Sequence, residues 1–319
     1  MKIVFFGSTI FSTHILDAIM QNTNFKVPLV ITIPDKISGR GLKKNFSPVK
    51  TYSLDKGLNI RQPVDLKDAS FLHELSGIGA DAFVVVAFRF LPKIVWEMAP
   101  SFNLHASLLP QYRGAAPIER CLMNGDKETG VTTFFLQNKI DTGDILLQKK
   151  VLIEHSDNNE TLRRKLANEG ARVVIDTLKM LDSGNIVTIK QDTIIGSNPN
   201  YFSKLHYAHK LDKSDFCINW DNPTISIHNQ IRALSPGWGA YTILNNNIKL
   251  KIFEAGYTIE QHNALPGTIV IESKKKLIIA TKDGFIEPIV VQVEGKKPMP
   301  ISAFLNGYKN KIMPEHKPE

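Results

Sequence analysis

The stretch Asp81-Ala-Phe-Val-Val-Val-Ala87 is an almost continuous apolar run, rich in β-branched residues. Such a run predicts a strand that is buried on both faces, as the strands of a parallel sheet are. Shorter apolar runs lie at residues 3–6 and 27–33, and apolar residues recur at helical spacing over residues 15–20. Strands that alternate with helices predict a parallel sheet with helices on both faces. We therefore expect an α/β domain with a Rossmann-like, mostly parallel sheet over residues 1–190.

The sequence pattern changes near residue 190. Residues 196–200 are rich in turn formers, and we expect a linker over residues 191–207. Beyond it, short strand-like runs separated by turns follow one another at residues 248–253, 267–271, 276–280 and 285–293. Closely spaced short strands predict a small barrel. We therefore expect a small β-barrel (OB-like) domain over residues 208–319.

The composition is that of an ordinary globular protein, with 319 residues, 43% hydrophobic and 22% charged. This length favours two domains, and this balance argues against global disorder. No apolar run approaches the roughly 20 residues of a membrane span, and the N-terminal run is too short for a signal peptide. Cys121 and Cys217 cannot form a disulfide framework and lie in no metal-ligand spacing. We therefore expect a cytoplasmic protein without a metal site, and a monomer.

An excess of basic residues gives the chain a net charge of +8. Part of this excess is concentrated in residues 36–50, which contain no acidic residue and hold Lys36, Arg40, Lys43, Lys44 and Lys50. Two interpretations fit these residues equally well. The segment is either a solvated surface loop or a basic finger that contacts phosphates.

The turn after the first predicted strand, Gly7-Ser8-Thr9-Ile10-Phe11-Ser12, lies where dinucleotide-binding domains carry their phosphate loop. It has one glycine where the dinucleotide fingerprint requires three, so side chains would block the approach of a pyrophosphate. This turn therefore argues against NAD or FAD binding and against a dehydrogenase.

Polar residues that suit acyl-transfer chemistry lie between residues 103 and 144. Asn103 and His105 are two residues apart, so on a strand their side chains share one face. They lie where a parallel strand would end, and open α/β sheets bind ligands at that edge. Asp141 follows in a loop that can fold back towards His105. Together the three side chains can stabilise an oxyanion, donate a proton and orient a base. No GxSxG motif marks Ser107 as a hydrolase nucleophile.

The same region carries three connected motifs: Asn103-x-His105-x-Ser107-Leu-Leu-Pro110, Arg113-Gly114-Ala-Ala-Pro117 and Asp141-Thr-Gly-Asp144. These motifs resemble those of the folate-dependent formyltransferase family. Residues 34–50, 233–238 and 295–299 are also similar to segments of the tRNA-specific members of that family. The resemblance therefore covers nearly the whole chain.

The resemblance implies transfer of the formyl group of 10-formyltetrahydrofolate, without a metal or NAD, to the α-amino group of methionine on initiator Met-tRNA, for translation initiation. It implies that Asn103 and His105 stabilise a tetrahedral intermediate and that Asp141 assists. The implied folate-binding residues are Phe88, Arg89, Phe90, Leu91, Ser107, Leu108, Leu109, Pro110 and Ile140. The implied tRNA-binding residues are Arg40, Lys43 and Lys44, with a tRNA-binding role for the second domain.

Two alternatives stay open beside this hypothesis. A member of the same family could formylate a sugar nucleotide, or a non-catalytic relative could bind tRNA only. The basic segment 36–50 and the second domain favour tRNA over a sugar nucleotide. The complete set of Asn103, His105 and Asp141 favours an enzyme. Where the family often has an Ala-Tyr-Gly type sequence, this chain has Ala87-Phe88-Arg89-Phe90-Leu91-Pro92. The resemblance implies that this segment lines the pterin pocket largely through backbone groups.

Overall fold

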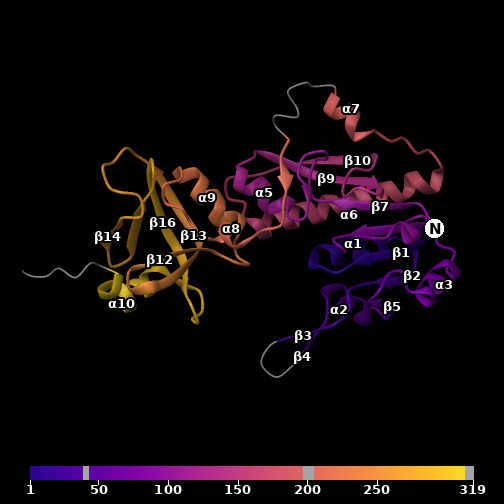
Figure 1. The fold of residues 1–319 in the computed structure, drawn as a ribbon, viewed down its shortest axis with the longest axis horizontal. Helices are drawn as coiled ribbons and strands as arrows, with labels where there is room; N and C mark the ends of the chain where they lie inside the picture. Colours follow the sequence, from indigo (N-terminus) through magenta and orange to yellow (C-terminus); the bar gives the residue numbers. More distant parts are fainter. Residues whose placement is uncertain (39–42, 197–204, 313–319) are drawn as a thin grey trace, which may run out of the picture. The chain divides into compact units, whose positions relative to one another are not determined.

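The computed structural model describes residues 1–38, 43–196 and 205–312 of the chain (Figure 1). The chain divides into two units. The first comprises Met1–Pro117, Glu128–Leu152 and Arg163–Ala208, and the second comprises Ile118–Lys127, Ile153–Leu162 and His209–Glu319. Two short segments from the first half of the sequence thus pack with the second unit.

The first unit is built on a seven-stranded sheet with the order β10-β9-β7-β6-β1-β2-β5 (Figure 1). Neighbouring strands from β7 to β5 run parallel, whereas β9 is antiparallel to β7 and β10 is antiparallel to β9. The bounds are β1 Lys2–Gly7, β2 Lys26–Ile31, β5 Ile60–Arg61, β6 Ala82–Val86, β7 Ser101–His105, β9 Glu128–Phe135 and β10 Ile145–Leu152. The expected mostly parallel sheet is confirmed.

Helices pack on both faces of this sheet, because its central strands are apolar on both sides. On one face, Phe6 and Phe83 of the strands share a buried cluster with Phe71, Leu75 and Val95 of α3 and α4. The helices described up to residue 196 are α1 Ile10–Met20, α2 Pro48–Asp55, α3 Ala69–Gly77, α4 Lys93–Trp96, α5 Pro117–Asn124, α6 Asn159–Ser183 and α7 Gln191–Gly196.

Helices α1 and α6 pack on the other face of the sheet, and the contact is close at Gly170 of α6. A Cβ on Gly170 of α6 would lie 2.8 Å from Cδ2 of Leu104 in β7 and 3.5 Å from Cδ1 of Ile15 in α1. Leu104 therefore points towards α6. Because side chains alternate along a strand, Asn103 and His105 point to the opposite face.

Two short pairs of strands lie outside the main sheet. The hairpin of β3 Lys36–Ser38 and β4 Lys43–Asn45 is inserted between β2 and α2, and its strands are antiparallel. Strand β8, Arg113–Gly114, pairs in parallel with β11, Tyr207–Ala208.

The second unit contains an antiparallel sheet with the order β12-β13-β16-β15-β14, and β17 adds to β16. Its buried core joins strand residues such as Ile252 and Ile286 to Ile227 of α9 and Phe304 of α10. The elements are α8 Lys213–Phe216, α9 Thr224–Ala233, β12 Ala240–Leu244, η2 Asn245–Asn247, β13 Ile248–Ile259, β14 Ile269–Ser273, β15 Lys276–Ala280, β16 Gly284–Val293, β17 Met299–Pro300 and α10 Ile301–Ile312. The expected small OB-like β domain is confirmed as an antiparallel sheet.

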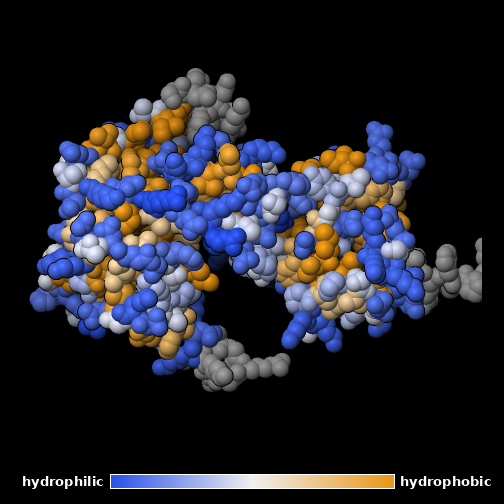
Figure 2. All heavy atoms as spheres, turned by 180° about the vertical axis from the view of Figure 1, so that it is seen from behind, coloured by the Kyte–Doolittle hydropathy of each residue, from blue (hydrophilic) through white to orange (hydrophobic). Residues whose placement is uncertain are grey.

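On the face that Figure 2 shows, hydrophilic residues of each unit are interspersed with hydrophobic patches. Within the described ranges, no helix combines the length and the apolar character that crossing a membrane requires.

Candidate active site

His105 is the last residue of β7, and its side chain is only 7% exposed. Its Nε2 lies 2.7 Å from the carbonyl oxygen of Tyr112, and its Nδ1 lies 3.8 Å from Oδ2 of Asp141. A carbonyl oxygen only accepts hydrogen bonds, so Nε2 carries a proton and donates it to Tyr112. Nδ1 is therefore the ring nitrogen that remains available to a substrate.

Asp141 lies in the loop between β9 and β10, and its side chain is 11% exposed. Its Oδ2 accepts a hydrogen bond of 2.9 Å from the backbone N–H of Gly114. Its φ angle of +53° lies in the left-handed region, which Asp and Asn adopt more readily than most other residues. The loop thus turns sharply at Asp141 and directs the carboxylate towards His105.

A second layer of polar contacts holds this loop. Gln191 Nε2 donates to the carbonyl oxygens of Asp141 at 3.0 Å and Gly143 at 2.8 Å. Arg113 donates to Gln191 Oε1 from Nε at 2.9 Å and from Nη2 at 2.7 Å. Gln191 is 2% exposed and lies at the start of α7. Gln191 could not be identified from the sequence, because a single glutamine after the last predicted helix belongs to no motif.

Asn103 lies on the same face of β7 as His105 and is partly buried. Among the residues that the structure describes, no group hydrogen-bonds to its side-chain amide. Its N–H groups therefore remain available on the face of β7 that also carries His105. The Asn103 amide is one hydrogen-bond donor, and His105 Nδ1 is a second when the ring is doubly protonated. Two such donors suit a reaction in which negative charge develops on an oxygen.

The segment after β6 contains four of the predicted folate-binding residues. Hydroxyls from the first turn hold its start, because Ser8 Oγ donates to the Ala87 carbonyl at 2.8 Å and Ser12 Oγ to the Val86 carbonyl at 2.7 Å. The Arg89 guanidinium donates hydrogen bonds to the carbonyl oxygens of Pro63 and Val64, and so connects this segment to the loop after β5. In the same segment, Phe88 is partly buried, Phe90 is exposed and Leu91 is buried.

The loop after β7 holds the next predicted folate-binding residues. Ser107 donates from Oγ to the Gln111 carbonyl at 2.6 Å and is fully buried. Thr132 Oγ1 donates to the Ser107 carbonyl at 2.6 Å and accepts from the Leu109 N–H at 3.1 Å. These contacts fix the path of the loop through Pro110. Leu108 is partly buried and Leu109 buried, whereas Ile140 beside Asp141 is exposed.

Two of the three predicted tRNA-binding residues lie in β4. Arg40 lies outside the described residues, Lys43 lies in β4, and Lys44 in β4 is exposed. Lys50, the last cation of the same basic segment, instead pairs with Asp35 at 2.6 Å.

The site contains no cluster of metal-ligating side chains. Over residues 1–38, 43–196 and 205–312, no three His, Cys, Asp or Glu side chains are grouped so that they could hold a metal ion. The site groups identified above are the Asn103 amide, the His105 ring and the Asp141 carboxylate.

The sequence of the chain matches models of known protein families. A family model described as formyl transferase matches residues 1–178, and one described as formyl transferase, C-terminal domain, matches residues 210–309. A methionyl-tRNA formyltransferase from Flavobacterium johnsoniae is 44% identical over 313 residues, which cover 96% of each chain.

Two solved structures share the fold. HypX from Aquifex aeolicus in complex with tetrahydrofolic acid gives a TM-score of 0.62 at 16% identity, covering 97% of this chain and 47% of that one. WlaRD, a sugar 3N-formyl transferase in the presence of dTDP and 5-N-formyl-THF, gives 0.63 at 23% identity, covering 93% and 99%. Because the family models match most of the chain and the Flavobacterium relative matches it almost from end to end, the chain belongs to the formyl transferase family.

Proposed function

We propose that this chain transfers the formyl group of 10-formyltetrahydrofolate to the α-amino group of methionine on initiator Met-tRNA, for translation initiation. The pairing of His105 Nδ1 with the Asp141 carboxylate at 3.8 Å, beside the unpartnered Asn103 amide, is the observation that carries the proposal. The Flavobacterium relative supports the choice of acceptor, since it matches both units of this chain and is named methionyl-tRNA formyltransferase.

The two donors act on the carbonyl oxygen of the formyl group. An unperturbed α-amine has a pKa of about 8, so roughly a tenth of it is neutral and nucleophilic at pH 7. When it attacks the formyl carbon, negative charge develops on the oxygen. The N–H groups of Asn103 and of His105 Nδ1 stabilise that charge. Each such donor is typically worth about 3–4 kcal/mol of activation free energy.

Asp141 supports the donor and handles a proton. Its carboxylate lies 3.8 Å from His105 Nδ1. In this proposal the His105 ring donates from both nitrogens, as an imidazolium, and the negative charge of Asp141 stabilises that cation. The attacking amine becomes positively charged as the new C–N bond forms. Asp141 can accept the amine's excess proton and pass it to the folate nitrogen that leaves.

The remaining predicted residues form the substrate contacts of this proposal. Phe88 to Leu91, Ser107 to Pro110 and Ile140 would line the folate site, with Ser107 and Leu109 shaping the backbone from buried positions. Arg40, Lys43 and Lys44 would contact the end of the tRNA.

The proposal also covers the domain organisation and the setting of the enzyme. We assign catalysis to residues 1–190, a linker to residues 191–207 and a tRNA-binding OB-like domain to residues 208–319. We further propose a cytoplasmic location, because neither Cys121 nor Cys217 forms a disulfide. We also propose that the enzyme is a monomer.

A substrate panel tests the function directly. The enzyme and 10-formyltetrahydrofolate are incubated separately with initiator Met-tRNA, the same tRNA uncharged, and a dTDP-amino sugar. We expect formylation of Met-tRNA alone. Formylation of the amino sugar would replace the proposal with the sugar-nucleotide alternative, and tRNA binding without any formylation would support the non-catalytic alternative.

A further inference from the structure

The ammonium group of Lys50 is held by three parts of the chain. It donates to Asp35 Oδ2 at 2.6 Å and to Gln62 Oε1 at 2.8 Å, and it lies 4.1 Å from the centre of the Phe46 ring. Asp35 immediately precedes β3, Phe46 immediately follows β4, and Gln62 immediately follows β5. Lys50 thus joins both ends of the β3–β4 hairpin to the edge of the main sheet.

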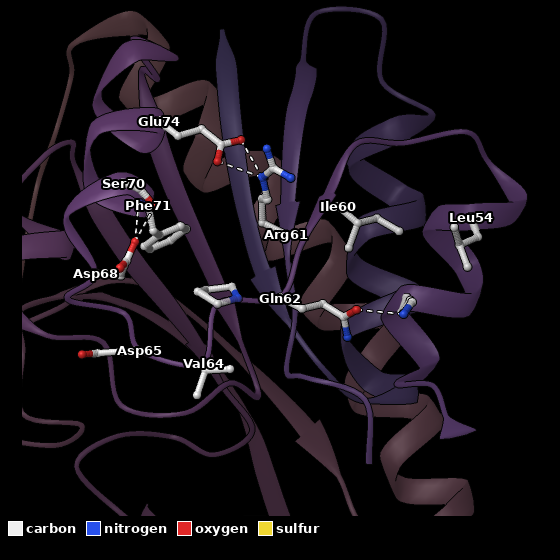
Figure 3. A pocket seen from close by; sticks show the side chains of 12 residues that line it. Leu54, Ile60, Arg61, Gln62, Val64, Asp65, Asp68, Ser70, Phe71 and Glu74 are labelled. Atoms are coloured by element: carbon white, nitrogen blue, oxygen red, sulfur yellow. Dashed lines mark hydrogen bonds and ion pairs between the residues drawn. The ribbon is translucent and has the colours of Figure 1, made fainter. Parts of the chain in front are cut away.

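Gln62 completes this arrangement. Its Nε2 donates to Asp35 Oδ1 at 2.8 Å and to the Ile33 carbonyl at 2.6 Å, so both carboxylate oxygens of Asp35 are engaged. Figure 3 shows Gln62 in the wall of a groove of about 740 Å³ that Ile60 and Arg61 also line. We call Asp35, Lys50 and Gln62 the root network, because they lie where the hairpin leaves the sheet.

A second cross-link joins the same two ends of the hairpin. The hydroxyls of Thr32 and Ser47 lie 2.7 Å apart, and both residues are buried. Ser47 Oγ also accepts the backbone N–H of Lys50 and so caps α2. The root of the hairpin is therefore fixed on both sides of the inserted strands.

The charge of Lys50 is already used within the protein. The side chains of Lys50 and Asp35 are 15% and 19% exposed, and the hydrogen bond from Lys50 lowers the pKa of the Asp35 carboxyl. Lys44 in β4 is exposed, by contrast. A phosphate would compete with Asp35 for the charge of Lys50, whereas Lys44 is exposed.

The strands of the β3–β4 hairpin are short. Each of its strands has three residues, and an isolated two-stranded hairpin is at best marginally stable in water. We propose that the root network of Asp35, Lys50 and Gln62 positions the β3–β4 hairpin to contact tRNA, without touching the tRNA itself. This inference rests on the proposed function, because it assigns the network a role in binding the acceptor substrate.

The test compares Lys50→Met with Lys44→Met in steady-state formylation of initiator Met-tRNA. If loss of the network leaves the hairpin oriented for binding about a tenth of the time, the KM for Met-tRNA rises about tenfold. We expect kcat and the KM for 10-formyltetrahydrofolate to stay within twofold of the wild type. The salt dependence of tRNA binding separates the two lysines, since losing one phosphate contact lowers the logarithmic slope by about 1. We expect that decrease for Lys44→Met and an unchanged slope for Lys50→Met.

Further variants separate positioning from general damage. Lys93→Met is the matched control, because Lys93 forms an exposed ion pair with Glu97 at 3.4 Å, away from the hairpin, and should behave as wild type. Lys50→Arg should recover most of the lost affinity. Asp35→Asn and Gln62→Leu should raise the same KM, and Asp35→Asn combined with Lys50→Met should cost no more than the larger single effect. Trypsin should cleave the hairpin several-fold faster in Lys50→Met than in the wild type.

Specific results would overturn the inference. An unchanged KM for Met-tRNA in Lys50→Met and Asp35→Asn would do so, as would a smaller salt slope in Lys50→Met, which would make Lys50 a direct phosphate contact. If Lys50→Met fails to fold, Asp35→Asn and Gln62→Leu decide the matter. A wild-type enzyme that does not formylate Met-tRNA would refute the proposed function, and the tRNA-positioning role with it. If only the positioning role is wrong, the wild-type enzyme formylates Met-tRNA, and Lys50→Met and Asp35→Asn do so with wild-type kinetics.

Discussion

Replacing Asp141 with Asn isolates the charge of the carboxylate from its shape. The amide oxygen can still accept the N–H of Gly114, and Asn tolerates the φ angle of +53° at this position as well as Asp does. The variant should therefore fold with the loop unchanged and lose only the negative charge that faces His105 Nδ1. The consequence for catalysis then measures what that charge does.

The magnitude follows from the separation of the two groups. Opposite unit charges 3.8 Å apart attract by about 4 kcal/mol at an effective dielectric constant of about 20. That dielectric suits side chains that are 7% and 11% exposed. If all of this attraction stabilises the transition state, the rate falls by roughly a thousandfold. We expect a loss of about 100- to 1,000-fold in kcat for Asp141→Asn, with the KM for both substrates nearly unchanged.

Single-turnover formylation of initiator Met-tRNA, resolved by electrophoresis of the charged tRNA, measures the chemical step. Asp192→Asn is a suitable control, because Asp192 is an exposed carboxylate on α7 next to Gln191. It should react at the wild-type rate, and thermal unfolding should show that both variants fold. A rate for Asp141→Asn within threefold of the wild type would refute the assigned role.

Three further predictions concern other parts of the structure. His105→Ala should lower kcat by about 100- to 1,000-fold without raising the KM for Met-tRNA, since it removes an oxyanion donor. Gln191→Leu leaves the Arg113 guanidinium and two carbonyls without their buried partner, so unfolding should become easier by about 3 kcal/mol, and kcat should fall while KM holds. Burial lowers the pKa of His228 to about 4. His228 therefore becomes protonated below pH about 6.5 in the unfolded chain but only below pH about 4 in the folded chain. The free energy of unfolding consequently decreases as the pH falls from about 6.5 to about 4. Replacing His228 with Phe should flatten this part of a urea-unfolding profile against pH, and an unchanged profile would contradict the assignment.

The sequence predicted the fold best where burial is uniform. The run over residues 81–87 predicted a strand, and β6 occupies Ala82–Val86 with every residue buried. Strand β10 was not predicted, because the middle of Ile145–Leu152 is polar and exposed and so resembles a loop. Strand β5 was also missed, since two residues are too few to carry a periodic pattern. Periodicity therefore identifies strands that are buried on both faces and misses those at the edge of the sheet.

The candidate site was predictable for side chains that lie on one strand. The spacing of Asn103 and His105 gives a shared face, and the return of Asp141 to His105 agrees with the expected fold-back. Gln191 was not predictable, because its contact with Asp141 spans 50 residues and depends on where α7 packs. The grouping of Ile118–Lys127 and Ile153–Leu162 with the second unit is likewise set by three-dimensional packing, which composition along the chain does not record.

The structure shows which of the basic side chains already have partners within the protein. Lys50 is neutralised by Asp35, and Arg120 by Asp215. The guanidinium of Arg89 is engaged by backbone carbonyls, and that of Arg113 by Gln191. These cations are among the 39 lysines and arginines of the chain, yet internal partners already occupy them. The salt dependence of tRNA binding should therefore follow exposed residues such as Lys44, and it should be weaker than a count of all the cations in segment 36–50 implies.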